Sequence, residues 1–98
     1  MAKFYLLNRA VEDISKIWNY TFDEWSEKHA DKYYHFLIDS CMELAENPRI
    51  GKSYDQIVSG LLGFKFGEHI IFYFIIDNQE IEIIRILHSR MDLKTKFA

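Results

Sequence analysis

Proline, glycine and cysteine are all scarce in this chain: its 98 residues include one Pro, four Gly and one Cys. The low Pro and Gly content excludes a collagen-like repeat and a low-complexity linker. A single cysteine permits no internal disulfide, which suits a reducing compartment. The sequence has no run of ~18 apolar residues that would span a membrane, and the apolar run near its start is too short for a signal peptide. We therefore expect a cytoplasmic protein that does not enter a membrane.

Positive charge is also in short supply. Lys and Arg number 12 against 15 Asp and Glu, which gives a net charge of −3. Residues 1–48 carry five basic and nine acidic side chains, whereas residues 49–98 carry seven and six. No segment has the density of cations that phosphate-driven binding requires. We therefore do not expect a non-specific nucleic-acid binder. We also expect no direct, sequence-specific binding to nucleic acid, and a protein partner stays open for the more basic second half.

Motifs for metals and cofactors are missing as well. His29 and His35 are six residues apart, whereas two ligands on one helical face require a spacing of about three or four. The segment 60–63, Gly-Leu-Leu-Gly, lacks the Lys and Ser/Thr of a nucleotide-binding loop. We therefore expect neither a metal nor a cofactor. Cys41 falls on the apolar side of a helical pattern, where a core role is favoured over a nucleophile.

Large aromatic side chains, by contrast, are abundant. The chain contains eight Phe, six Tyr and two Trp, and 49% of its residues are hydrophobic. This length allows one domain with a thin core, which cannot easily enclose so many rings. Trp18, Trp25, Tyr33 and Tyr34 lie close together in the sequence. Core packing accounts for most such residues, but any that stay exposed are rigid anchors for a protein partner.

Hydrophobic periodicity predicts a single α+β domain over residues 1–98. Apolar residues spaced by three and four predict helices over 9–25 and 30–46, the second of which ends before Pro48. Runs of β-forming residues predict strands over 3–7, 62–66, 69–76 and 80–88, followed by a tail over 89–98. The short link between the helices predicts an antiparallel helical hairpin, and the last three strands form an antiparallel meander. The hairpin is expected to pack on one face of a mostly antiparallel sheet.

Two histidines in the second half raise the question of catalysis. His69 and His88, with cations to hold a phosphate, fit a general acid/base site for RNA cleavage. The other members of such a site would be Tyr73, Arg85, Arg90 and Asp92. A turn-capping role for His69 and a structural or partner-binding role for His88 are the more frequent uses of such positions. Both interpretations stay open at this point.

Several segments, in the right order along the chain, resemble the ParE toxins of bacterial toxin–antitoxin modules. They include Leu44-Ala45-Glu46-Asn47-Pro48 with Gly51 just after it, His69-Ile70-Ile71-Phe72-Tyr73, and Arg85-Ile86-Leu87-His88 followed by Met91-Asp92. The resemblance covers nearly the whole chain. It implies the RelE/ParE-like fold, which agrees with the architecture expected from periodicity.

The resemblance implies the toxin of a type II toxin–antitoxin module, a plasmid stabilisation protein that binds and poisons DNA gyrase without chemistry of its own. It also implies a cognate antitoxin, which wraps an otherwise disordered segment over the toxin. For the target, we expect the end of the last strand and the charged tail to bind: Arg85, His88, Arg90, Met91 and Asp92. For the antitoxin, we expect the aromatic residues of the hairpin and the central strand: Trp18, Trp25, Tyr33, Tyr34 and Tyr73.

Two alternatives share the same fold. RelE toxins resemble ParE toxins but cleave messenger RNA on the ribosome, using a cluster of Lys and Arg with a C-terminal Tyr or His. ParE sequences often carry Arg at two sheet positions where this chain has Leu62 and Phe74. The loss of two cations weakens the ribonuclease alternative and leaves gyrase as a target to be tested. The third possibility is a decayed toxin that only binds its antitoxin.

Overall fold

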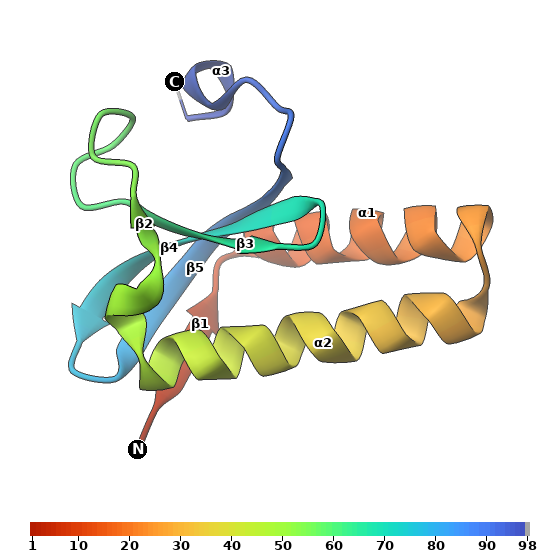
Figure 1. Ribbon diagram of the computed structural model, residues 1–98, viewed down its shortest axis with the longest axis horizontal. Helices are drawn as coiled ribbons and strands as arrows, with labels where there is room; N and C mark the ends of the chain where they lie inside the picture. Colours follow the sequence, from red (N-terminus) through yellow and green to blue (C-terminus); the bar gives the residue numbers. More distant parts are fainter. Residues whose placement is uncertain (98) are drawn as a thin grey trace.

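The structure is a computed structural model that describes residues 1–97, so Ala98, the end of the predicted tail, lies outside the described residues. It has the α+β architecture and the order of elements expected from the sequence (Figure 1). The main elements are β1 (Lys3–Leu6), α1 (Asn8–Glu24), α2 (Glu27–Glu46), β3 (Leu62–Phe66), β4 (His69–Asp77) and β5 (Glu80–His88). Three short elements lie in segments without hydrophobic periodicity: the 3-10 helix η1 (Pro48–Ile50), β2 (Lys52–Ser53) and α3 (Leu93–Lys96).

The five strands form one mixed sheet in the order β1-β5-β4-β3-β2. β3, β4 and β5 form the antiparallel meander that the sequence predicts. β1, however, pairs with β5 in parallel, with Lys3 opposite Glu80 and Leu6 opposite Ile83, so the sheet as a whole is not antiparallel. The reason is topological. The chain leaves β1 through the helical hairpin, enters the sheet at the opposite edge and returns to the side of β1 only with its last strand.

The link between the two helices is shorter than the sequence indicates. α2 begins at Glu27 and not at residue 30. Ser26 is its N-cap, and the Ser26 side chain accepts a hydrogen bond from the His29 N–H at 3.2 Å, which satisfies one of the donors that a helix start leaves unpaired. The polar segment 26–29 is therefore a cap and a first turn. Among residues 1–97, no helix is both long enough and apolar enough to cross a membrane.

α1 and α2 cover one face of the sheet, the lower one in Figure 1, and enclose the larger part of the core. The buried residues of this cluster are Ala10, Ile14, Leu37, Cys41, Leu44, Ala45, Ile71, Tyr73, Ile81, Ile83 and Ile86. Burial raises the pKa of the Cys41 thiol to about 12. A thiol with so high a pKa has almost no thiolate at neutral pH, so Cys41 is a core residue and not a nucleophile.

The other face of the sheet is covered by the loop after β2 and by the C-terminal segment, which lie on the upper side in Figure 1. Its buried residues are Leu61, Ile70, Phe72 and Leu87. The Phe97 ring lies edge-on to Phe72, with centroids 5.1 Å apart, and Leu93 packs in the same cluster. Because these two apolar side chains are four residues apart on one side of α3, the tail folds back onto the sheet and does not extend freely from it.

A buried ion pair joins α1 to the last strand. The Asp13 carboxylate accepts hydrogen bonds from Nε and Nη2 of Arg85 at 2.8 and 3.0 Å, and from the Ile86 N–H at 2.9 Å. The side chains of Arg85 and Asp13 are only 11% and 7% exposed. β1 pairs with only the first half of β5, so Asp13 supplies the acceptor that a longer β1 would offer to Ile86. The register of β4 and β5 shifts at Ile84, and such a bulge changes the direction of the side chain beside it.

Replacing Asp13 with alanine is expected to lower the free energy of unfolding by about 3–5 kcal/mol, because it leaves a buried guanidinium and a buried backbone N–H without their acceptor. Urea denaturation of D13A and of the natural chain measures this difference. Asp39→Ala is the matched control, since it removes the same charge from an exposed position on α2 and should change the stability by less than ~0.5 kcal/mol. An equally small effect of D13A would contradict the structural role given to the ion pair.

Candidate functional site

The residues expected to bind the target fall into two separate environments. Arg90, Met91 and Asp92 lie in the exposed turn that follows β5. Arg85, in contrast, is held inside the protein by Asp13, and the hydrogen bonds that it donates to Asp13 raise the pKa of its guanidinium. The structure therefore brings four of the five candidates together at the end of β5 and gives the fifth, Arg85, a partner within the fold.

His88 shapes the turn that carries the exposed candidates. Its Nδ1 accepts a hydrogen bond from the Arg90 N–H at 3.2 Å, and the Met91 N–H donates to the His88 carbonyl at 3.0 Å. The Ser89 N–H donates to the Glu68 carbonyl at 2.8 Å, which ties the turn to the β3–β4 connection. An accepting Nδ1 places the proton of the neutral ring on Nε2, which lies 3.9 Å from Glu68 Oε2. His88 thus fixes the backbone of the turn at Arg90 and Met91.

A polar cluster, which we call the sheet-end cluster, surrounds His88 and comprises Tyr33, Glu68, His69 and His88. His69 is directly opposite His88 in the register of β4 and β5, and their rings are 5.5 Å apart. His69 Nδ1 lies 3.0 Å from the hydroxyl of Tyr33. Burial lowers the pKa of His69, and the neighbouring His88 lowers it further. His69 is therefore neutral near pH 7, linked to α2 through Tyr33.

Two groups of the hypothetical RNA-cleaving site, Tyr73 and Arg85, have their partners elsewhere in the fold. Tyr73 is fully buried; its hydroxyl donates to the Pro48 carbonyl at 2.7 Å and accepts from the Gly51 N–H at 3.1 Å. Asp92 caps α3, accepting from the Lys94 N–H and from the Thr95 hydroxyl. The constellation suggested by the sequence is thus divided among three sites. Residues 1–97 also contain no group of three His, Cys, Asp or Glu able to hold a metal ion.

The aromatic residues of the hairpin form a second exposed region, which we call the hairpin aromatic surface: Trp18, Phe22, Trp25 and Tyr34. Trp18 and Phe22 stack with ring centroids 5.3 Å apart. Trp25 is 71% exposed at the end of the hairpin, and Tyr34 is 39% exposed. Positions 18, 22 and 25 share one side of a helix. The sequence did not single out Phe22, although its spacing of four from Trp18 is the signal that places it there.

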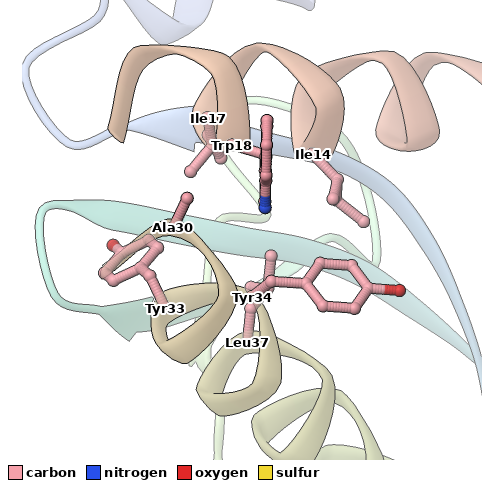
Figure 2. A pocket seen from close by; sticks show the side chains of 7 residues that line it. All are labelled: Ile14, Ile17, Trp18, Ala30, Tyr33, Tyr34 and Leu37. Carbon is pink, nitrogen blue, oxygen red and sulfur yellow. The ribbon is translucent and has the colours of Figure 1, made fainter. Parts of the chain in front are cut away.

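Figure 2 shows how the hairpin presents these rings. Trp18 projects from α1 towards α2, while Tyr33 and Tyr34 leave α2 in opposite directions. The indole N–H of Trp18 donates to Asp31 at 3.1 Å, which fixes the ring between the helices. The cavity lined by these residues measures only 10 Å³, room for no more than one water molecule. The hairpin therefore offers an exposed surface and not a pocket for a small ligand.

Two of the five residues expected to bind an antitoxin have other roles. Tyr73 cannot contact a partner, because its side chain is fully buried beneath the helices and its hydroxyl fixes the segment 48–51. We therefore remove Tyr73 from the candidate contacts. Tyr33 is partly buried against Phe66, at 4.9 Å between ring centroids, and belongs to the sheet-end cluster. Trp18, Trp25 and Tyr34 remain as candidates.

Comparison with known proteins gives independent evidence from sequence. The profile of the family described as "ParE toxin of type II toxin-antitoxin system, parDE" matches residues 4–93. Toxin ParE1 from Mycobacterium tuberculosis (strain CDC 1551 / Oshkosh) is 35% identical over 94 residues, which cover 95% of this chain and 96% of that protein. Toxin ParE1 from Caulobacter vibrioides (strain ATCC 19089 / CIP 103742 / CB 15) is 30% identical over 94 residues, with 96% of both chains covered.

Two solved structures have the same fold at low sequence identity. A chain of the chromosomal ParDE system from P. aeruginosa has a TM-score of 0.76 and 17% identity, over 90% of this chain and 96% of that one. A chain of the toxin–antitoxin complex RelBE2 from Mycobacterium tuberculosis has a TM-score of 0.68 and 18% identity, over 90% and 98%. Because a ParDE and a RelBE structure both match, the fold does not distinguish the two kinds of toxin, whereas the sequence matches are with ParE proteins.

The lowered pKa of His69 predicts a loss of stability in acid. The unfolded chain binds a proton at the ordinary pKa of 6.5, while the folded chain binds it only at lower pH, so the free energy of unfolding falls as the pH drops from above 6.5 towards the folded pKa. Urea denaturation at pH 7.5 and at pH 5.5 measures how much the free energy of unfolding falls between these two pH values. The fall should be smaller for His69→Gln than for the natural chain. His35→Gln, at an exposed position of α2, is the control and should keep the full difference; an unchanged difference in H69Q would contradict the prediction.

Proposed function

The chain belongs to the ParE family of toxins of type II toxin–antitoxin systems, and from this membership we propose that it binds and poisons DNA gyrase and is neutralised by a cognate antitoxin. A toxin of this kind acts by binding at a protein surface and needs no catalytic group.

The observation that carries the proposal is that both faces of the sheet are covered by apolar packing. Leu62 packs against the core beneath the helices, and Phe74 packs under the opposite layer with Phe97. Phosphate binding requires exposed cations, and these two positions hold partly buried apolar side chains instead. A sheet closed in this way supports a protein target over an RNA substrate. A ribonuclease on this chain would depend on His88 and Arg90 without the cations of the sheet.

The turn after β5 has the properties of a target-binding element. Arg90 and Met91 are exposed, and hydrogen bonds from the backbone of the turn to His88 and Glu68 fix their positions. A cation beside a flexible apolar side chain is a frequent pair at protein interfaces. Because the turn is fixed before contact, little conformational entropy is lost on binding. We assign target binding to this turn, with His88 as a positioning residue.

The hairpin aromatic surface has the properties of an antitoxin-binding site. Its exposed rings can bury a large apolar area with few rotatable bonds, as interface anchors do. A disordered segment that folds on binding suits an extended surface of this type better than a compact pocket. The fold match to a ParDE structure and to a RelBE toxin–antitoxin complex is consistent with such a partner.

The first experiment adds the purified protein to gyrase with supercoiled plasmid, and in parallel to translating ribosomes. We expect linear, gyrase-linked DNA and intact messenger RNA. Arg90→Ala should weaken gyrase poisoning at least about tenfold, because interface cations at such positions often contribute ~1.4 kcal/mol or more. Arg49→Ala is the matched control, since it removes the same charge from an exposed position in η1.

The outcomes of this experiment separate the alternatives. Cleaved message with untouched plasmid would favour a RelE-like ribonuclease and reject gyrase as the target. Inactivity in both assays, with antitoxin binding retained, would identify a decayed toxin. Gyrase poisoning that R90A and R49A reduce equally would reject the turn as the binding element while keeping the target.

The antitoxin contact has its own test. Tyr34→Ala should weaken the complex with the antitoxin at least about tenfold, because it removes an exposed ring from the hairpin aromatic surface. Tyr20→Ala is the control: Tyr20 is also exposed on the hairpin, but two residues from Trp18 it lies on the opposite side of α1. Titration calorimetry of both variants measures the difference. Equal affinities for the two variants would exclude this surface as the site.

A further inference from the structure

A groove of 350 Å³ lies where the start of α1 and the C-terminal segment meet the last strand. We call it the junction groove. It is lined by Leu7, Asn8, Arg9, Ile84, Arg85, Lys96 and Phe97. They come from the start of α1, from β5 and from the end of the α3 segment (Figure 1). β1 covers only the first half of β5, so the groove lies at the part of the sheet edge that has no neighbouring strand.

Two of the three cations that line this groove have no ion-pair partner within residues 1–97. Arg9 and Lys96 are exposed, and neither forms an ion pair within residues 1–97. α1 also begins here, and no side chain of the described residues pairs with the free N–H groups at its start. Its N-cap is Leu7, whose side chain accepts no hydrogen bond, and its first turn contains no acidic residue. The unpaired N–H groups of a helix start carry partial positive charge. Two cations and an uncapped helix start therefore face the same hollow.

Arg85 supplies a separate indication that an acceptor is absent. Asp13 binds its Nε and Nη2, but within residues 1–97 the buried Nη1 has no hydrogen-bond partner. The side chain as a whole is 11% exposed. Buried donors in native proteins are nearly always paired. Arg85 lines the groove together with Arg9 and Lys96, and three cationic side chains around one hollow favour an anionic ligand.

The shape of the groove indicates which kind of anionic group fits it. Leu7, Ile84 and Phe97 give it an apolar wall beside the cations. A free phosphate would satisfy the cations and leave this wall in contact with water. A carboxylate side chain next to a large apolar side chain, both on one extended peptide, would satisfy the cations and cover the wall.

Exposed apolar side chains lie beside the groove at the start of α1. Leu7 and Val11 are 41% and 46% exposed, and positions 7, 11 and 18 lie on one side of α1. The side of α1 next to the groove therefore offers apolar contacts at Leu7 and Val11, before Ile14 turns into the core. We propose that the junction groove binds an acidic residue, flanked by a large apolar one, on an extended segment of the antitoxin. The identity of the partner rests on the proposed function, whereas the chemistry of the groove does not.

The first test uses defined peptides and does not depend on the antitoxin. Acetyl-Leu-Glu-Phe-amide is titrated into the isotope-labelled protein and followed by NMR, with acetyl-Leu-Gln-Phe-amide and inorganic phosphate as comparisons. The Glu peptide should shift the Asn8 and Arg9 amides and the Arg85 Nε–H, with at least about tenfold higher affinity than the Gln peptide. R9A/K96A should abolish these shifts. The matched control K16A/K94A removes the same charge from exposed positions on the same two helices and should retain them.

Each other result of the titration overturns part of the proposal. Equal binding of the Glu and Gln peptides would show that the groove does not recognise a carboxylate, which rejects the acidic residue of the proposal. Phosphate binding as tight as that of the Glu peptide would make the groove a simple anion site and reject the peptide. Shifts that persist in R9A/K96A would place the binding elsewhere on the protein.

The second test uses the protein encoded next to this chain as the antitoxin. R9A/K96A should weaken the complex at least about tenfold, and K16A/K94A less than about twofold, with a steeper salt dependence for the natural chain than for R9A/K96A. Equal affinities for the natural chain and R9A/K96A would reject the groove as an antitoxin contact. If the natural chain does not bind the neighbouring protein at all, the proposed function fails, while the peptide titration still decides the chemistry of the groove.

Discussion

The Asp13 carboxylate holds the helical layer to the last strand, and the surfaces described above are positioned through that attachment. One carboxylate satisfies a guanidinium and a backbone N–H where β1 has ended. Because charges this deeply buried are costly to separate, the start of α1 cannot move independently of β5. The junction groove, the hairpin and the turn after β5 therefore keep a fixed relation to one another, which a single partner chain can use.

Because both faces of this small sheet are covered, little of its surface is left exposed for binding or catalysis. α1 and α2 cover one face, while the loop after β2 and the tail cover the other. Exposed chemistry is therefore confined to edges, turns and the outer side of the hairpin. The exposed rings, the rigid turn at Arg90 and the groove at Arg9 all lie in such places. This distribution is typical of a protein that acts by contact with other proteins.

Local patterns in the sequence predicted most of the fold, and failed where pairing or packing is non-local. Periodicity placed two helices and the meander because their signals lie within a few residues. The parallel pairing of β1 with β5 joins strands more than seventy residues apart, and no local signal reports it. The choice of candidate binding residues failed for the same reason, because burial depends on non-local packing. Residue type selected Tyr73 and Arg85 as surface groups, but their exposure is set by α1, α2 and η1, which pack over them from elsewhere in the chain.

The pairing of the first strand with the last also determines when the toxin can complete its fold. β5 must lie between β1 and β4 before the sheet is complete, so a growing chain cannot finish folding until its final segment has been made. Contacts between distant parts of a sequence slow folding, because the connecting chain must be ordered first. A nascent toxin therefore remains incomplete throughout its own synthesis.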